Sequence, residues 1–400
     1  MRSSRARGLV VVGIAGALVL TGCTTTTPED PGDGADLTIG SIDLAAAGCP
    51  SPLKIAIDWF PEAEHGHLYE LVGPDPTFEN TSEYSVTGPL MASGEYTGID
   101  VTLISGGAAN ADGSFKQPDV MMYDDPSILL GYVGNDEAVV HSAPFVDDGS
   151  GGYPTVGIFA PLEKDPQMIM WDPATYPDVT GIADLGAAGV PINVFQGGFY
   201  IDYFLHEGIV TESQMDYTYD GSPSNWLTAN GAAAQQGFAS AEPYIYENEV
   251  ENWMKPVAYQ LINDAGYPKY AAVVSTKPEN VETYADCFTA LVPVLQQAEL
   301  DYYADPAETN ELVLAAVAAY DTYWVYSEGV AAYSVETQQE IGLVGNGPDS
   351  TLGNVDPTRF QALIDAATEI YADNDEFNIV EGLTVDDLFT DQFLDPALGF

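Results

Sequence analysis

The chain has 400 residues, of which 46% are apolar, so it can bury a large core in one or two domains. It carries 61 acidic residues against 10 lysines and arginines, a net charge of −51 at pH 7. Such a surface repels nucleic acids and anionic lipids, which excludes both as partners. Because the acids are spread along the whole chain, we attribute the charge to solubility, as in a saline habitat.

The pattern of the N-terminal residues predicts an export signal. An apolar segment, 8–20, follows a basic start and is too short to span a membrane. The basic start is formed by Arg2, Arg5 and Arg7. Leu20-Thr21-Gly22-Cys23 resembles a bacterial lipobox, which implies cleavage before Cys23 and lipidation of its thiol. The alternative is an ordinary signal peptide with a chance cysteine. Residues 24–36, rich in Thr, Pro, Asp and Gly, are expected to form a tether.

Two further cysteines, Cys49 and Cys287, remain in the exported chain. Outside the cytoplasm an even pair is a disulfide candidate, and two buried thiols are the alternative. No cysteine spacing typical of a metal site occurs, so we predict no metal.

The first predicted strand, 53–57, leads into the loop Asp58-Trp59-Phe60-Pro61-Glu62-Ala63-Glu64-His65-Gly66-His67, and a short helix follows over 68–72. In open α/β sheets, ligands bind beyond such strand ends. The alternative is an aromatic-capped loop with surface histidines.

Two more strands are predicted in this half, 99–104 and 118–123. The first ends at two glycines. The second ends at Asp124, and a helix is expected to start near Ile128. Strands that each end in polar or Gly-rich residues before a helix predict a doubly wound α/β lobe. Segment 79–94 gives no clear prediction.

The pattern changes after residue 150, where 155–160 and 168–171 are predicted to cross into a second lobe. There, a strand at 190–194 is followed by the turn Phe195-Gln196-Gly197-Gly198-Phe199 and a helix over 200–206. A helix N-terminus carries free amide donors, although a Gly pair is more often only a turn.

A short strand over 237–241 places Glu242 at its end, where its carboxylate can face a cleft or simply charge a helix N-terminus. Segments 257–262 and 270–274 are predicted to return to the first lobe. The remaining chain is predicted to be helical. Its apolar stripes are expected to be core, and they include Phe288, Leu291, Val313, Tyr320, Trp324, Phe360 and Leu363.

The lipobox, the two α/β lobes and the loop Asp58–His65 resemble the substrate-binding proteins of ABC importers. The most similar branch includes the binders of thiamine pyrimidine precursors and the fungal pyrimidine synthase, with sulfonate and nitrate binders as relatives. The loop matches an Asn/Asp-Trp, variable residues with a Pro, then His. Segments 192–208 and 239–247 and the helix opened by Asp305-Pro306 also resemble the family. His67 departs from it, since a Gly is common there.

The resemblance implies a type II periplasmic-binding-protein fold, with two doubly wound α/β lobes joined by a two-stranded hinge. It also implies that Trp59 stacks a flat ring, that His65 lies near the ligand, and that Phe195 to Gly198 line the second lobe with Glu242 reaching the cleft. Phe199 adds an aromatic face. We further predict contacts from Tyr123, Asp124 and Tyr244.

The expected domains are a signal peptide at 1–22, a lipidated tether at 23–50, the first lobe at 51–150, the second lobe at 151–258, and the returning first lobe with C-terminal helices at 259–400.

No base falls in a predicted pocket loop, which argues against an anionic ligand. The bases considered are Lys54, Lys116, Lys164, Lys255, Lys269, Lys277 and Arg359.

These features predict a monomer, lipid-anchored on the outer face of the bacterial cytoplasmic membrane, that delivers a small neutral or cationic nitrogen heterocycle to an ABC permease. A thiamine-type pyrimidine fits, and sulfonate, nitrate or riboflavin-like solutes are alternatives. No cofactor is expected. A pyridoxal-dependent pyrimidine synthase is disfavoured, because no lysine lies between Lys54 and Lys116 and no Cys-rich segment occurs. An adhesin or sensor domain is a third hypothesis.

Overall fold

The computed structural model describes residues 37–111, 113–146, 151–372, 377 and 379–400. The predicted signal peptide, Cys23 and residues 24–36 of the predicted tether lie outside this set. Every helix and strand below belongs to the compact unit Thr38–Phe400. Within the described residues, none of the helices combines the length and the apolarity that crossing a bilayer requires.

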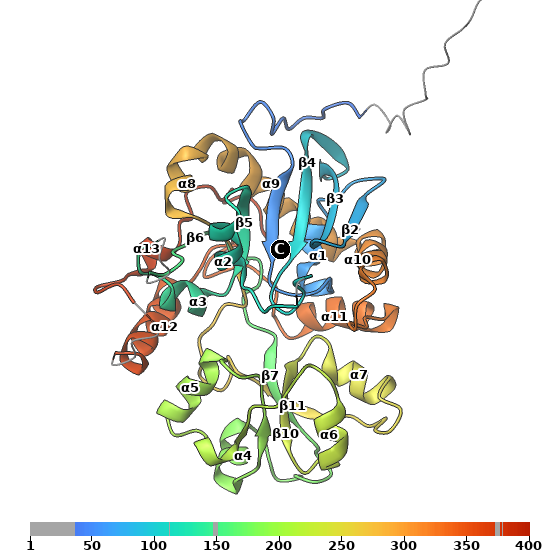
Figure 1. Cartoon of the computed structure of the whole chain (residues 1–400), viewed down its shortest axis with the longest axis vertical. Coiled ribbons are helices and arrows are strands. Elements are labelled where there is room, and N and C mark those ends of the chain that lie inside the picture. The colour runs from blue at the N-terminus through green and yellow to red at the C-terminus, as the bar shows by residue number, and fades with distance from the viewer. Residues whose placement is uncertain (1–36, 112, 147–150, 373–376, 378) are drawn as a thin grey trace, which may run out of the picture. The chain divides into compact units, whose positions relative to one another are not determined.

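A seven-stranded mixed sheet forms the first lobe, in the order β2-β3-β4-β1-β5-β12-β6 (Figure 1). The central strands β4, β1 and β5 are parallel, and the others pair antiparallel. The strands are β1 (Leu53–Ile57), β2 (Thr77–Asn80), β3 (Tyr84–Ala92), β4 (Glu95–Ser105), β5 (Ile128–Val133), β6 (Val156–Phe159) and β12 (Val273–Thr276).

The helices of this lobe come from both ends of the chain. They are η1 (Ala63–His65), α1 (Gly66–Tyr69), α2 (Pro118–Asp124), α3 (Asn135–Val140), α8 (Pro278–Thr283), α9 (Ala285–Ala304), α10 (Ala307–Tyr320), α11 (Glu328–Glu340), α12 (Pro357–Ile370) and α13 (Val385–Leu388). The apolar stripe of α9 shares one buried core with β1, as expected from its spacing. A disulfide joins Cys49, just before β1, to Cys287 on α9.

A five-stranded sheet forms the second lobe, in the order β11-β7-β10-β8-β9. Its strands are β7 (Gln167–Trp171), β8 (Ile192–Asn193), β9 (Met215–Asp216), β10 (Ala234–Phe238) and β11 (Ala258–Leu261). Its helices are α4 (Ile182–Ala188), α5 (Phe199–His206), α6 (Ser224–Ala229), η2 (Glu212–Gln214) and α7 (Glu242–Asn248).

The chain passes between the two sheets along two segments, 160–166 and 262–272 (Figure 1). Both lie several residues after the predicted boundaries at 150/151 and 258/259, because β6 pairs in the first sheet and β11 in the second. The domain boundaries themselves stay predictions.

Two predicted elements of the first lobe are wrong, because strand and helix are exchanged. Segment 118–123 is the helix α2, with Pro118 at its first turn. The buried Pro118, Met121 and Met122 have the i, i+3, i+4 spacing of one helix face, and methionine is a good helix former. The segment that starts at Ile128 is the strand β5. All six of its residues are buried, as is typical of a strand covered on both faces.

Candidate functional site

One cavity of about 380 Å³ is lined by residues of both lobes. From the first sheet it receives the segments that follow β1, β4 and β5. From the second sheet it receives the segments that follow β8 and β10. The two crossing segments add Leu162, Asp165, Lys269 and Ala271. The cavity therefore lies beyond strand ends, where open α/β sheets bind their ligands.

Aromatic rings from both lobes meet in this cavity. Trp59, after β1, contacts Phe195, after β8, edge to face, with ring centroids 6.2 Å apart. The ring of Trp324 is nearly perpendicular to that of Trp59, with the two ring centroids 6.0 Å apart. The indole Nε1 of Trp324 donates to the carbonyl of Pro61, which holds Trp324 against the loop after β1. These rings provide the apolar faces that a flat ligand needs.

The turn from 195 to 199 is fixed by a buried glutamine. Gln236 Oε1 accepts hydrogen bonds from the Phe195 amide at 3.1 Å and from Tyr200 Oη at 2.8 Å. Gly197 has a φ of +88°, a backbone conformation that residues other than glycine rarely adopt. A glycine thus allows the backbone to turn toward the cavity before α5 begins.

Three glutamates of the cavity, Glu62, Glu64 and Glu242, form a group that we call the glutamate triad. Glu62 and Glu64 lie at the start of η1 in the first lobe, and Glu242 opens α7 in the second. The Ser240 hydroxyl of the second lobe donates to Glu64 Oε1. Glu242 accepts hydrogen bonds from the Phe238 amide at 2.6 Å and from Tyr219 Oη at 3.4 Å.

Burial governs the protonation of the triad. Desolvation raises the pKa of Glu62 well above its ordinary value, and the carboxylates of Glu64, Asp58 and Glu242 raise it further. Burial also raises the pKa of Glu64, although the Ser240 hydroxyl opposes part of that shift. The pKa of Glu242 is raised to about 7, mainly by burial. In all three groups burial thus favours the protonated form over the ionised one.

A second acidic group surrounds Lys269, and we call Lys269, Asp136 and Asp165 the lysine cluster. The ammonium lies 3.4 Å from Asp136 Oδ1 and 3.2 Å from Asp165 Oδ2. Burial alone would lower the pKa of Lys269, but the carboxylates of Asp136, Asp165 and Glu137 outweigh it and raise that pKa. Lys269 is therefore a permanently charged partner for these carboxylates.

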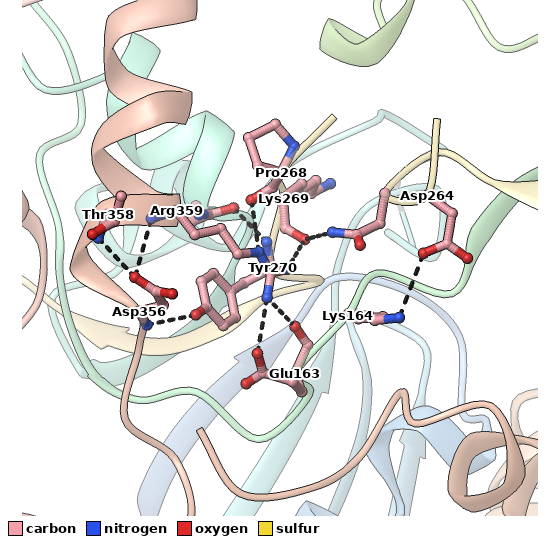
Figure 2. A network of polar contacts seen from close by, with 11 residues as sticks. Glu163, Lys164, Asp264, Pro268, Lys269, Tyr270, Asp356, Thr358 and Arg359 are labelled. Carbon is pink, nitrogen blue, oxygen red and sulfur yellow. Dashed lines mark hydrogen bonds and ion pairs between the residues drawn. The ribbon is translucent and has the colours of Figure 1, made fainter. Parts of the chain in front are cut away.

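Arg359, on α12, clamps the two crossing segments together behind the lysine cluster (Figure 2). Its Nη1 donates to the backbone carbonyl of Glu163 at 2.7 Å and to Glu163 Oε1 at 3.0 Å. Its Nη2 and Nε donate to the carbonyls of Lys269 and Pro268, at 2.7 Å and 3.2 Å. The guanidinium lies over the Tyr270 ring at 3.9 Å from the centroid. One side chain thereby fixes both crossings and the backbone that carries Lys269.

Hydrogen bonds also join the lobes at the edge of the cavity. Besides Ser240 to Glu64, Tyr333 Oη on α11 donates to the Ala239 carbonyl at 3.2 Å. Ser327, which caps α11, donates to Glu249 beyond α7. The structure therefore shows the two lobes in contact across the cavity.

Most of the predicted binding residues line this cavity, and three do not. Those that line it are Trp59, His65, Phe195, Gln196, Gly197, Gly198, Phe199 and Glu242. His65 is only 1% exposed, and its Nε2 lies 2.7 Å from Asp58 Oδ1. Tyr123 and Asp124 lie on α2, where Tyr123 donates to the Pro154 carbonyl and Asp124 pairs with Lys116. Tyr244 packs on Tyr333 instead. Because 118–124 is a helix, Asp124 does not stand at a strand end.

Several cavity residues were not predicted from the sequence. Lys269 contradicts the expectation that no base reaches the pocket, and Trp324, predicted as core, lines the cavity. Asp136 and Glu137 lie in the first turn of α3, shortly after β5, so a correct strand prediction there would have pointed to them. The other residues missed include Glu62, Glu64, Tyr132, Asp165, Tyr219 and Gln236.

No group of three or more histidines, cysteines or carboxylates within the described residues is placed to hold a metal ion. The described lining of the cavity combines aromatic faces with fixed polar groups, and its carboxylates clearly outnumber its one lysine.

No protein-family model matches the sequence, and no curated protein matches it. Several solved structures are similar to this chain. The periplasmic aliphatic sulphonate binding protein SsuA from Escherichia coli aligns with a TM-score of 0.50 and 11% identity, over 84% of this chain and 91% of that one. The alkanesulfonate-binding protein SsuA from Xanthomonas axonopodis pv. citri, bound to MOPS, also gives 0.50 and 11%, over 85% and 98%.

The desulfurization enzyme DSZB aligns with a TM-score of 0.46 and 13% identity, over 86% of this chain and 97% of that one. At 11% identity the likeness to the two SsuA structures shows the fold and not the ligand or the activity. As the loop after β1 and the two α/β lobes predicted, the chain has the periplasmic-binding-protein fold.

Proposed function

We propose that the chain is the extracytoplasmic solute-binding protein of an ABC importer. It captures a small, neutral or cationic nitrogen heterocycle between its lobes and delivers it to a permease, as a monomer anchored through a lipid on Cys23. The observation that carries this proposal is a single cavity with aromatic rings from both lobes and a surplus of carboxylates. A thiamine-type aminopyrimidine has the flat ring and the N–H donors that such a cavity would select.

The charge of the cavity supports a cation over a sulfonate or nitrate. Among the described residues that line the cavity, Lys269 is the one basic side chain apart from His65, and two carboxylates already pair with its ammonium. An anion would have to displace one of those buried partners and lie among the remaining acids. Carboxylates also accept hydrogen bonds from ring and exocyclic N–H groups, which strengthens this preference.

The same lysine argues against pyridoxal chemistry, so we propose a binding protein without catalysis. A lysine that forms a Schiff base must lose its proton, which requires a lowered pKa. The carboxylates around Lys269 raise its pKa instead. Absorbance of a bound pyridoxal group in the purified protein would contradict this conclusion.

A ligand screen followed by substitution of Trp59 tests the proposal. Ligands that raise the melting temperature would be sought among pyrimidines, flavins, polyamines and sulfonates, and their affinity measured by calorimetry. Trp59→Ala should weaken binding of the best ligand about tenfold or more, through loss of a central aromatic contact. Tyr323→Ala removes an exposed aromatic side chain that does not line the cavity, and should leave the affinity unchanged. Equal affinities of wild type and Trp59→Ala would reject this role for the cavity.

A further inference from the structure

We propose that the glutamate triad is the subsite for a positively charged group of the ligand, an ammonium or a protonated ring nitrogen, and that this charge bridges the two lobes. The inference deepens the proposed function and rests on it. It assigns the cation to Glu62, Glu64 and Glu242, and not to the lysine cluster.

The first argument is that only one of the two acidic groups has a cation of the protein itself to balance its charge. The lysine cluster contains its own cation, held at 3.2 Å and 3.4 Å by Asp165 and Asp136. The triad has none: no ion pair among the described residues includes Glu62, Glu64 or Glu242. Carboxylates shielded from water without a counter-charge are unfavourable, so a cation entering the cavity gains more at the triad.

The second argument comes from the free oxygen of Glu64. This side chain is only 5% exposed, and one oxygen accepts from Ser240. The other, Oε2, has no partner within hydrogen-bond geometry among the described residues, although the Ser334 hydroxyl is near enough to lower the pKa of Glu64. Because buried polar atoms are almost always hydrogen-bonded, an unpartnered oxygen on a carboxylate that lines the cavity indicates a missing donor. An ammonium or a protonated ring nitrogen supplies that donor with a charge-assisted hydrogen bond.

The third argument is the position of the triad across the gap between the lobes. Two of its members come from the loop after β1, and the third comes from α7 of the second lobe. Their negative charges repel when the lobes meet, and a cation between them turns this repulsion into attraction. Trp59, Trp324 and Phe195 line the same cavity, so their faces can contribute cation–π attraction.

The other titratable groups around the triad supply no free cation. The charge of His65 opposes part of the rise in the pKa of Glu64, but the Nε2 of His65 is paired with Asp58 at 2.7 Å. Burial raises the pKa of the neighbouring tyrosines, which stay neutral donors. They are Tyr132, Tyr219, Tyr302 and Tyr326.

The proposal is tested with two probes that share one ring: an aminomethyl-pyrimidine, whose side chain is an ammonium, and the corresponding hydroxymethyl-pyrimidine, which is neutral there. Affinities are measured by calorimetry, or by NMR line broadening if binding is weak. Wild type should bind the ammonium probe about tenfold more tightly, and the double variant Glu64→Gln/Glu242→Gln should lose that preference. Glu247→Gln, an exposed position on the same helix, should keep it.

The outcomes separate this proposal from the proposed function. If the double variant retains the preference for the ammonium probe, or if wild type shows none, the assignment of the cation to the triad is wrong. Binding of the neutral probe by the double variant checks that it folds. A wild-type protein that binds neither probe, nor any compound of the screen, contradicts the proposed function itself.

Discussion

The two acidic groups of the cavity are built from the same kind of residue and differ in what neutralises them. Asp136 and Asp165 share the ammonium of Lys269, which reaches them from the second crossing segment. Glu62, Glu64 and Glu242 have no such partner, and burial raises the pKa of each. One group is complete without a ligand, and the other is completed by protons or by a cation.

The difference shows how acidic residues can serve stability in one place and binding in another. A buried carboxylate with a permanent cation holds its neighbours in place, because separating the pair exposes both charges. A buried carboxylate without a permanent cation is unfavourable in its ionised form, and binding of a cationic ligand removes this cost. The following predictions test this contrast, beginning with the largest effect.

Removing the internal cation should strongly destabilise the protein. Lys269→Met leaves Asp136 and Asp165 buried without a counter-charge, which is expected to lower the free energy of unfolding by about 3–5 kcal/mol. Urea denaturation followed by circular dichroism measures this change. Lys164→Met removes a half-exposed pair with Asp264 and should change it by less than about 1 kcal/mol. Equal effects of the two substitutions would show that the lysine cluster has no special role.

Replacing the clamp behind the lysine cluster should have a smaller effect. Arg359→Lys keeps the charge but loses the planar group that donates to Glu163, Pro268 and Lys269, so we expect a loss of about 2 kcal/mol. Hydrogen exchange should become faster in the crossing segments 160–166 and 262–272. Thr358→Ala, at an exposed neighbouring position, is the control. Unchanged exchange in both crossings would argue against a clamp.

The triad should make the stability of the ligand-free protein fall as the pH rises. Glu242 has a pKa of about 7 in the folded protein, above its ordinary value, so between these values the folded chain holds a proton that the unfolded chain has lost. Stability is thus highest at the acidic end of this window and declines by about 1–2 kcal/mol toward neutral pH. Lys269, whose pKa is raised from an already high value, contributes no change there.

Melting temperatures at about pH 5 and about pH 8 measure this decline, and Glu242→Gln should reduce it. Glu247→Gln changes the net charge equally and should leave the decline as it is. A bound cation should oppose the loss at the higher pH, since it favours the ionised triad. A decline of equal size in wild type and Glu242→Gln would remove Glu242 as its source.

The sequence by itself predicted the two-lobed fold and a large part of the cavity wall. The loop after β1, the turn at 195–199 and the position of Glu242 each follow a strand, and local patterns report such strand ends directly. The cysteine pair could be proposed from count and compartment alone, and the structure joins Cys49 to Cys287. The predictions for α2 and β5 were exchanged because an apolar run of six or seven residues is too short for its hydrophobic period to distinguish a helix from a strand.

Only the tertiary structure decided the electrostatics of the cavity. Asp136, Asp165 and Lys269 belong to three segments far apart in the chain, and Trp324 returns to Trp59 from beyond α10. No local pattern encodes such meetings, because ion pairs and ring contacts depend on which surfaces the folded lobes bring together. Composition determined that the protein is acidic, and the fold determined which acids are already neutralised and which remain open to a ligand.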